Sequence, residues 1–572
     1  MDSSERVQKA EQAWRAAQAD ALQRDAARRV RTDFGLEIKP VYTPADLAAQ
    51  NFEYERDVGF PGAFPFTRGN TPTMYRDQLW RIAQYGGFST AQESNRLFKN
   101  LIAHGQTELN LAFDLPTQLS YDPDDPRAAG EVGKVGISLS SLRDWETIFA
   151  DIPMDSVYIY SVSNAQAVVT IAMHLALARK QGADLSKLRG GMQNDVLKEY
   201  VARGNYIFPI DAGMRLAADT LLYCAHHVPE YWTINVGGYH ICESGANTVH
   251  EGAYSLAIAL AYLDQVHRLG VPVEKVASKM SFLMTPNHNR FFEDICKFRA
   301  CRRLWARLLS ERYGITDPQC LIFRLYAHNG GSVLTRQHPE TNITRSAIAA
   351  VVAALGGAQN VCLRTMDECL GIPSEESQFI GIRSQQVVAY ETGIANTVDP
   401  LGGSYYVEYL TNEYESRMRA EIARIDARGG MAKAIADGYV QSVITADAIA
   451  LQRAIDSGEV ARVGMNKFVT ASNDSDQKVR RYYRQDPGVE STRRRELKQL
   501  REERDNAAVA VALERLRQAA ARPASVDNNL MDVVVDAVTA YATMGEICEV
   551  LRSVFGTYDG ATASAEPAAL AA

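Results

Sequence analysis

The sequence lacks the features that mark secreted, zinc-binding and membrane-spanning proteins. Its eight cysteines are scattered without a CxxC pair, so neither a disulfide framework nor a zinc site is expected. No apolar run reaches the roughly 18 residues of a membrane span, and the closest, 347–356, is about half that length. The first residues, MDSSERVQKAEQ, are charged and contain no signal-peptide core. We therefore expect a cytoplasmic protein with reduced thiols and no membrane segment.

Basic residues are also too few for a nucleic-acid-binding protein. The chain has 61 Lys and Arg against 69 Asp and Glu, which gives a net charge of −8 and no electrostatic footprint for nucleic acid. Hydrophobic residues make up 46% and charged residues 23%, close to globular averages, so a disordered or fibrous chain is excluded. A length of 572 residues is sufficient for a large core in one or several domains.

The middle of the chain has the pattern of an α/β protein. Between about residues 65 and 400, apolar or β-branched runs alternate with helical patterns such as 255–270 and 289–314. A spacing of about 40 residues predicts parallel βα units. Polar residues recur where these runs end, which favours a closed (β/α)8 barrel of the TIM type over an open doubly wound sheet, the alternative. The expected strands are 109–117, 156–165, 233–241, 279–285, 320–329 and 360–365.

The remaining segments are predicted to be mainly helical. A charged helical pattern over about residues 1–35 has no apolar stripe wide enough to stand alone, so it should lie along a partner or the body of the protein. Helical patterns also cover 410–444 and, as one further segment, 527–555. We expect an N-terminal arm (1–64), the barrel (65–400), a helical extension (401–470), a linker with helices (471–560) and a disordered tail (561–572).

A barrel places its site at the carboxyl ends of the strands, so polar residues at predicted strand ends are the candidates for chemistry. For any one of them a structural hydrogen bond is the commoner role, whereas convergence at one mouth favours a site. His240, beside Tyr239 in a glycine-rich strand end, is the best single acid or hydrogen-bond donor. The sequence contains no nucleophile elbow, Walker loop, GxGxxG motif or metal-spaced His/Cys cluster. The candidates are Asp114, Ser163, Asn164, Gln193, Asn194, Asp195, Tyr239, His240, Glu243, His328, Asn329, Asp367 and Glu368.

Nine motifs carry a resemblance to a known family. They are FPFTRG (64–69), PTMY (72–75), QYGGFSTAQESN (84–95), AFDLPT (112–117), QNDVLKEY (193–200), GYHICESGA (238–246), VDPLGGSYYVE (398–408), GGMAKAI (429–435) and VGMNKF (463–468). In this order, without large gaps, they resemble the large, substrate-binding subunit of the methylmalonyl-CoA mutase family. The resemblance covers about residues 35 to 556.

The resemblance implies an isomerase that rearranges acyl-CoA carbon skeletons with adenosylcobalamin, whose Co–C bond supplies a radical while the protein shields and orients it. In the family, a separate domain presents cobalamin through the histidine of a DxHxxG motif. That motif is absent here. The chain therefore resembles the family's two-subunit members, which implies a heteromer with a small cobalamin-binding subunit that supplies the axial histidine. A G-protein chaperone is a further partner implied by the family.

The resemblance also implies roles for individual residues. His240 and Gln193 match the pair that holds the migrating thioester carbonyl, and Tyr239 matches the aromatic residue beside the reacting carbons. Tyr85 matches the tyrosine between cofactor and substrate, and Arg203 matches the arginine that grips a substrate carboxylate. Further expected substrate-binding residues are Thr71, Met74, Arg81, Lys279 and Ser281. The residues expected to face the cofactor are Phe113, Leu115, Glu243, His328 and Glu368.

The resemblance also implies a substrate class, because the Tyr85 and Arg203 pair, with Ala112, matches the members that act on a carboxylated acyl-CoA such as methylmalonyl- or ethylmalonyl-CoA. The alternatives are an isobutyryl- or 2-hydroxyisobutyryl-type mutase and a non-catalytic mutase-like binding or regulatory subunit. The chain departs from the family pattern at several site positions, and aromatic rings in place of small hydroxyls should narrow or reroute a pantetheine channel. The departures are Gln78, Arg81, Ala83, Tyr158, Tyr160, Val162, His328, Ser332 and Arg364.

Overall fold

The computed structural model describes residues 3–26, 30–154, 157–470, 486–558 and 560. Within these ranges, nine parallel strands form one sheet in the order β5-β4-β3-β2-β1-β9-β8-β7-β6. The strands are β1 (Arg81–Gly86), β2 (Glu108–Leu111), β3 (Tyr158–Ser161), β4 (Gly190–Met192), β5 (Tyr231–Trp232), β6 (Ile234–Val236), β7 (Met280–Met284), β8 (Leu325–His328) and β9 (Asn360–Cys362). The α/β class is confirmed, and each of the six predicted strands overlaps an observed one.

The sheet closes into a barrel because β5 and β6 are two halves of one strand position. β5 pairs with β4 through Gly191 and Trp232, whereas β6 pairs with β7 through Ile234 and Met280. The backbone N–H of Asn235 also donates to the carbonyl of Gln193, just beyond β4, at 2.9 Å. Counting β5 and β6 as one position gives eight strands, as in the predicted (β/α)8 barrel.

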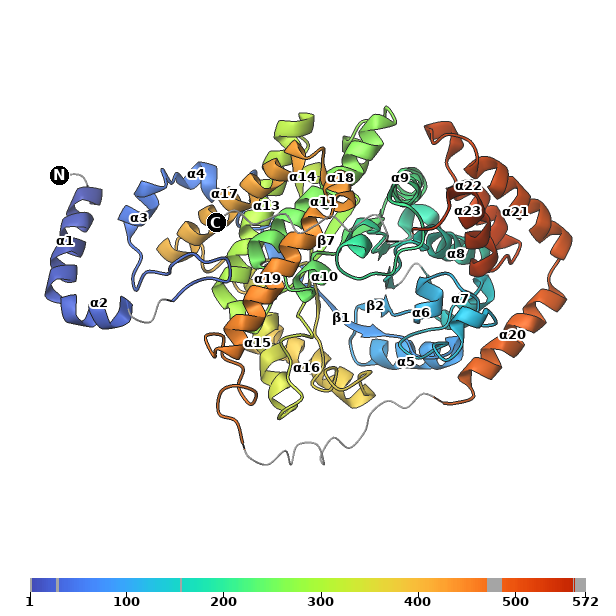
Figure 1. Cartoon of the computed structure of the whole chain (residues 1–572), viewed down its shortest axis with the longest axis horizontal. Helices are drawn as coiled ribbons and strands as arrows, with labels where there is room; N and C mark the ends of the chain where they lie inside the picture. The colour runs from blue at the N-terminus through green and yellow to red at the C-terminus, as the bar shows by residue number, and fades with distance from the viewer. Residues whose placement is uncertain (1–2, 27–29, 155–156, 471–485, 559, 561–572) are drawn as a thin grey trace.

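Helices cover the outside of the barrel (Figure 1). After each strand position comes at least one helix, which returns the chain so that the next strand runs parallel. The principal helices in this layer are α5 (Ala91–Ala103), α7 (Leu142–Ile148), α8 (Ala167–Lys180), α9 (Ile210–His227), α11 (Thr248–Arg268), α13 (Phe291–Tyr313), α15 (Thr341–Leu355) and α16 (Glu375–Glu391). The short helices are α6 (Leu115–Gln118), α10 (Gly238–Glu243), α12 (Glu274–Ala277) and α14 (Pro318–Leu321).

Further helices lie outside this layer, with the N-terminal ones at one side of the barrel and the last four of the chain at the opposite side (Figure 1). The N-terminal ones are α1 (Ser3–Ala17), α2 (Ala19–Ala26), α3 (Pro44–Ala49) and α4 (Tyr54–Asp57). The C-terminal ones are α17 (Tyr405–Ala427), α18 (Met431–Ala436), α19 (Tyr439–Asp456), α20 (Val489–Glu503), α21 (Asn506–Ala520), α22 (Met531–Thr539) and α23 (Met544–Phe555). No helix in the described ranges is long and apolar enough to cross a membrane.

The flanking helices differ from the prediction at two places. The expectation of one helix over residues 1–35 is wrong, since the described part is divided into α1 and α2, and Arg31 pairs with Glu37 in an isolated antiparallel bridge. The predicted single helical segment 527–555 is divided into α22 and α23, because Thr543 forms a capping box that starts a new helix. The expected tail 561–572, and 471–485 of the expected linker, lie outside the described residues.

The interior of the barrel is filled by aromatic side chains. Its buried cluster consists of Tyr158, Tyr160, Val162, Tyr239, Leu283 and Tyr326. The hydroxyls of Tyr158 on β3 and Tyr326 on β8 lie 2.7 Å apart. In the sheet, β2, β1 and β9 separate these two strands, so the contact crosses the middle of the barrel. A packed interior of this kind is usual for TIM barrels.

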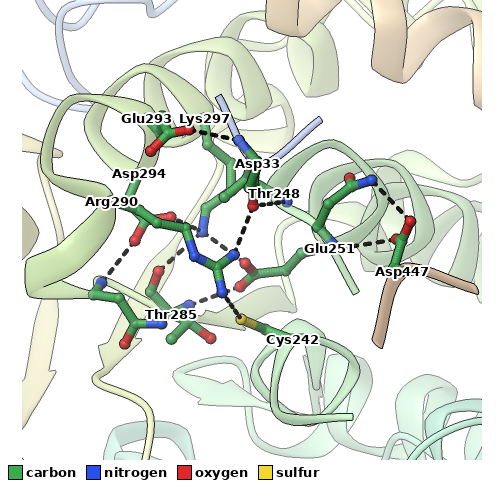
Figure 2. Close-up of polar contacts among 12 residues, drawn as sticks. Asp33, Cys242, Thr248, Glu251, Thr285, Arg290, Glu293, Asp294, Lys297 and Asp447 are labelled. Atoms are coloured by element: carbon green, nitrogen blue, oxygen red, sulfur yellow. Dashed lines mark hydrogen bonds and ion pairs between the residues drawn. The ribbon is translucent and has the colours of Figure 1, made fainter. Parts of the chain in front are cut away.

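A buried ionic network fixes the elements behind the carboxyl ends of the strands (Figure 2). Lys297 on α13 donates to Glu251 of α11 at 2.7 Å and to Asp294 at 2.6 Å, and all three side chains are buried. Glu251 also accepts a 2.8 Å hydrogen bond from the backbone N–H of Thr285, directly after β7. The lysine thereby ties two barrel helices to the end of a strand.

Arg290 extends this network to the N-terminal segment. Its Nη1 pairs with Asp33 at 2.9 Å, while its Nη2 lies 3.8 Å from the sulfur of Cys242 on α10 (Figure 2). Asp33 also accepts a 2.9 Å hydrogen bond from the backbone N–H of Thr248, at the start of α11. The segment before the barrel thus helps to hold α10, the helix that follows β6.

Replacement of Lys297 by alanine should strongly destabilise the fold. The change leaves the carboxylates of Glu251 and Asp294 buried without their cation, which typically costs about 3–5 kcal/mol. Lys433→Ala is the matched control, since the Lys433–Asp437 pair on the surface should change the free energy of unfolding by no more than about 1 kcal/mol. Chemical denaturation of both variants measures the difference, and equal stabilities would show that the buried network contributes little.

Candidate functional site

The carboxyl ends of the strands bring five predicted site residues to one mouth of the barrel. Tyr85 lies near the end of β1, Gln193 follows β4, and His328 ends β8. Tyr239 and His240 follow β6, although they lie in the first turn of α10 and not in the strand that the sequence predicted. Because all strands are parallel, these side chains share one end of the barrel.

Gln193 is held with its amide nitrogen free to donate. The backbone N–H of Asp195 donates to Oδ1 of Asn164 at 3.1 Å, so the Asn164 amide nitrogen faces the other way. That nitrogen donates to Oε1 of Gln193 at 3.0 Å. Nε2 of Gln193 is buried and has no hydrogen-bond partner within the described part of the chain. A fixed donor without a partner is suited to a ligand carbonyl.

Arg203 brings a positive charge to the same mouth. Its guanidinium makes one ion pair in the described structure, a 3.4 Å contact to Glu199, and its side chain is 19% exposed. Burial raises the pKa of Tyr85, and the charge of Arg203 acts against that rise. Burial also lowers the pKa of His240, and Arg203 is among the charges that lower it further. The charge of the guanidinium therefore shifts the pKa values of both residues. Its N–H groups that do not face Glu199 remain free to bind an anion.

Arg364, just beyond β9, adds a second guanidinium between two aromatic rings. Its Cζ lies 5.0 Å from the ring centre of Tyr239 and 5.7 Å from that of Tyr85. Its Nη1 donates to Glu368 at 2.8 Å, while its Nε is buried without a partner among the described residues. The arginine and the two tyrosines, contributed by three different strand ends, form a continuous wall of the site.

Both histidines of the site are neutral near pH 7. Burial lowers the pKa of His240 well below its ordinary value, and the charges of Lys198, Arg203 and Arg364 lower it further. Burial, assisted by Arg364, lowers the pKa of His328 to about 3. His240 is therefore available as a neutral hydrogen-bond donor and not as an imidazolium acid.

The other residues expected at the cofactor have varied surroundings. Glu243 accepts hydrogen bonds from the backbone N–H groups of Gly331 and Ser332 at 2.9 and 3.0 Å, which fixes the loop after β8. Phe113 is fully buried in the main hydrophobic core, whereas Leu115 is half-buried at the start of α6. Among these expected residues, His328 and Glu368 contact the wall of the site, through Tyr239 and Arg364 respectively.

Most of the remaining expected substrate residues lie at the opposite end of the barrel. Thr71 and Met74 belong to a turn whose neighbour Asn70 donates to the carbonyl of Phe323, before β8. Arg81 begins β1 and Lys279 precedes β7, so both are at amino-terminal strand ends. Ser281, inside the barrel, accepts a 2.8 Å hydrogen bond from Asn235. The structure does not bring these five residues to the mouth that holds His240.

Lys198 contributes to the site and Asn164 positions Gln193, and neither role was predicted from the sequence. Lys198 is fully buried beside Glu199, and burial lowers its pKa to about 8. A lysine within the motif QNDVLKEY, so close to Gln193, is the signal that could have identified it. No cluster of three or more potential metal ligands occurs in the ranges that the structure describes.

The family model and the relatives that match this chain agree on one family. The family model described as methylmalonyl-CoA mutase matches residues 31–557. The chain is 37% identical over 551 residues to the 2-hydroxyisobutanoyl-CoA mutase large subunit of Aquincola tertiaricarbonis, covering 95% of this chain and 96% of that relative. It is 38% identical over 524 residues to the methylmalonyl-CoA mutase of Cereibacter sphaeroides, covering 92% and 72%. The methylmalonyl-CoA mutase large subunit of Streptomyces virginiae is 37% identical over 550 residues, covering 96% and 74%.

The neutral state of His328 predicts a pH dependence of stability. Its folded pKa lies below the unfolded value of about 6.5, so the unfolded chain takes up a proton that the folded chain excludes as the pH falls. Between pH 7.5 and 5.5, the wild type should lose about 1.4 kcal/mol more unfolding free energy than His328→Asn. Denaturant titrations at the two pH values measure this difference, and identical losses would mean that His328 titrates normally in the folded protein.

Proposed function

Because the chain belongs to the methylmalonyl-CoA mutase family, we propose that it is the large, substrate-binding subunit of an adenosylcobalamin-dependent acyl-CoA mutase. The reaction is the rearrangement of the carbon skeleton of a carboxylated, branched acyl-CoA of the methylmalonyl or ethylmalonyl type. The guanidinium of Arg203 is the observation that supports a carboxylated substrate. Its charge shifts the pKa values of Tyr85 and His240, and it makes one 3.4 Å ion pair in the described structure.

A substrate carboxylate fits the donors that Arg203 leaves free. Glu199, its partner, also accepts from the ammonium group of Lys198 and from the backbone N–H of Asn205 at 2.9 Å. That carboxylate is therefore shared among several donors and does not fully satisfy Arg203. A planar guanidinium with unused N–H groups binds a carboxylate through two parallel hydrogen bonds.

His240 and Gln193 would hold the thioester carbonyl. Both are uncharged donors, and Gln193 is fixed by Asn164, so neither has to reorganise when the carbonyl gains negative character. Tyr85, Tyr239 and Arg364 would enclose the reacting carbons. Tyr239 is buried, and Tyr85 and Arg364 are partly buried, so they limit the access of water and would protect a reactive intermediate from unwanted hydrogen donors.

The mouth of the barrel also has groups suited to a polar cofactor. His328 presents a buried Nε2 without a partner in the described chain, and Glu368 lies beside Arg364, so these two residues would contact it. Phe113 does not fit this role, because it is fully buried in the core. Adenosylcobalamin, when bound, supplies the radical that starts the rearrangement. Two relatives are named large subunits, which supports a small cobalamin-binding partner that contributes the axial histidine.

Substrate competition tests the carboxylate assignment. In the complex reconstituted with its cobalamin-binding subunit, kcat/KM should be higher for methylmalonyl-CoA than for isobutyryl-CoA. Arg203→Gln should lower kcat/KM for methylmalonyl-CoA by about 10- to 100-fold, the usual scale for loss of a buried charge-assisted contact. The exposed Arg517→Gln, on α21, is the control and should change neither value.

Two other outcomes would indicate a different function for this chain. Faster turnover of isobutyryl- or 2-hydroxyisobutyryl-CoA than of any dicarboxylic thioester would favour an isobutyryl- or 2-hydroxyisobutyryl-type mutase, and the second of these is the type named for the Aquincola relative. Binding of the partner and cofactor without turnover of any of these thioesters would favour a non-catalytic mutase-like subunit.

His240 should be essential to turnover but not to folding. His240→Ala removes one preorganised donor from the carbonyl, which should lower kcat by about 10²–10³. Alanine is a good helix former, so α10 should remain intact. The control His267→Ala replaces an exposed histidine of α11 and should leave kcat unchanged. Near-normal turnover of His240→Ala would remove the residue from the proposed mechanism.

A further inference from the structure

Lys198 is a fully buried cation next to His240. Its side chain is 0% exposed, and its ammonium group donates to Oε1 of Glu199. A β-carbon added at Gly237 would lie 3.1 Å from Cγ of Lys198 and 2.9 Å from Nδ1 of His240, so the glycine makes room for both side chains. A buried ammonium group is costly unless a carboxylate compensates it, so Lys198 and Glu199 hold each other in place.

Glu199 is the carboxylate that Lys198 shares with Arg203. Its Oε1 accepts from the ammonium group and lies 3.4 Å from Nη1 of Arg203, beyond the usual range of about 2.7–3.2 Å for an N–H···O hydrogen bond. Its Oε2 accepts from the backbone N–H of Asn205 at 2.9 Å. Both oxygens are thus engaged by other donors, and Arg203 is left with a weak contact.

Arg203 is placed to take over this carboxylate when Lys198 is lost. It follows Glu199 by four residues, and its backbone N–H donates to the carbonyl of Lys198 at 3.4 Å, so one turn of the chain brings the two side chains together. A guanidinium and a carboxylate that are free to pair form two parallel hydrogen bonds. Such a pair would occupy the N–H groups that the proposed function assigns to the substrate carboxylate.

The other ionisable groups beside Lys198 cannot replace it. The carboxylate of Asp195 accepts from the hydroxyl of Tyr262 at 2.8 Å and has the same sign of charge as Glu199. His240 is neutral, because burial and the charge of Lys198 lower its pKa. Neither group can therefore supply the positive charge that Glu199 receives from the lysine.

We propose that Lys198 is a positioning residue that determines substrate specificity, because by holding Glu199 it leaves Arg203 free to bind a substrate carboxylate. This inference rests on the proposed function and states what keeps the carboxylate-binding donors available. Loss of Lys198 should weaken the binding of a carboxylated thioester alone. Loss of the Glu199 charge in the same protein should restore that binding.

Lys198→Met tests the first expectation, because methionine has a similar length and no charge. In the complex reconstituted with the cobalamin-binding subunit, KM for methylmalonyl-CoA should rise about tenfold while kcat stays within about twofold. The value of kcat/KM for isobutyryl-CoA should not fall. The control Lys433→Met changes an exposed lysine of α18 and should alter none of these values. An equal loss for both thioesters would show a merely structural role and would overturn the proposal.

The double variant Lys198→Met/Glu199→Gln tests the competition for Arg203 directly. It replaces the competing carboxylate by an amide, whose oxygen can still accept from the backbone N–H of Asn205. The KM for methylmalonyl-CoA should therefore return to within about threefold of the wild-type value. A double variant with a KM as high as that of Lys198→Met would contradict the inference, since Glu199 would then not be the competitor.

Binding measurements separate the failure of this inference from the failure of the proposed function. Methylmalonyl-CoA and isobutyryl-CoA are titrated calorimetrically into the same complex. The wild type should prefer methylmalonyl-CoA, and Lys198→Met should reduce the ratio of the two Kd values about tenfold. If the wild type turns over no thioester, the proposed function fails, while the change in this ratio still decides the role of Lys198. Equal ratios in the wild type and in Lys198→Met, including no preference in either, would overturn the inference.

Discussion

The strand position at residues 231–236 is shared between two neighbours, and the rest of the molecule depends on this arrangement. Its first half pairs with β4 and its second half with β7, which closes the ring of parallel strands. A closed parallel ring directs every carboxyl end to one side. Gln193, His240, His328 and Arg364, which lie far apart in the sequence, therefore belong to one site.

The site combines uncharged donors with guanidinium groups because its electrostatics are set by burial. Burial and neighbouring cations lower the pKa of His240 and keep it neutral, so neither His240 nor Gln193 carries a charge. Arg364 is stabilised by Glu368 and by the faces of two tyrosines, whereas Arg203 keeps donors available. The guanidinium of Arg364 is thus part of the wall of the site, whereas that of Arg203 can bind a ligand.

Much of this arrangement could be predicted from the sequence. Strands that coincide with apolar runs, such as 156–165 and 279–285, were predicted, because such runs are typical of buried parallel strands. β1 and β4 were missed. β1 contains Arg81 and Gln84, which interrupt its apolar residues, and two of the three residues of β4 are glycines. The glycines before His240 concealed the start of α10. The contact of Tyr158 with Tyr326 spans 168 residues and depends on barrel closure, so no local pattern could reveal it.

The tyrosines that fill the interior of the barrel have a mechanical consequence for the protein. Tyr158 and Tyr326 link strands on opposite sides of the barrel, and Arg81 joins both of them to Glu108. The spacing of the barrel walls is therefore set by side chains of the chain itself. Ligand binding at the mouth does not have to bring the walls together, so its interaction energy remains available for orienting the reacting group.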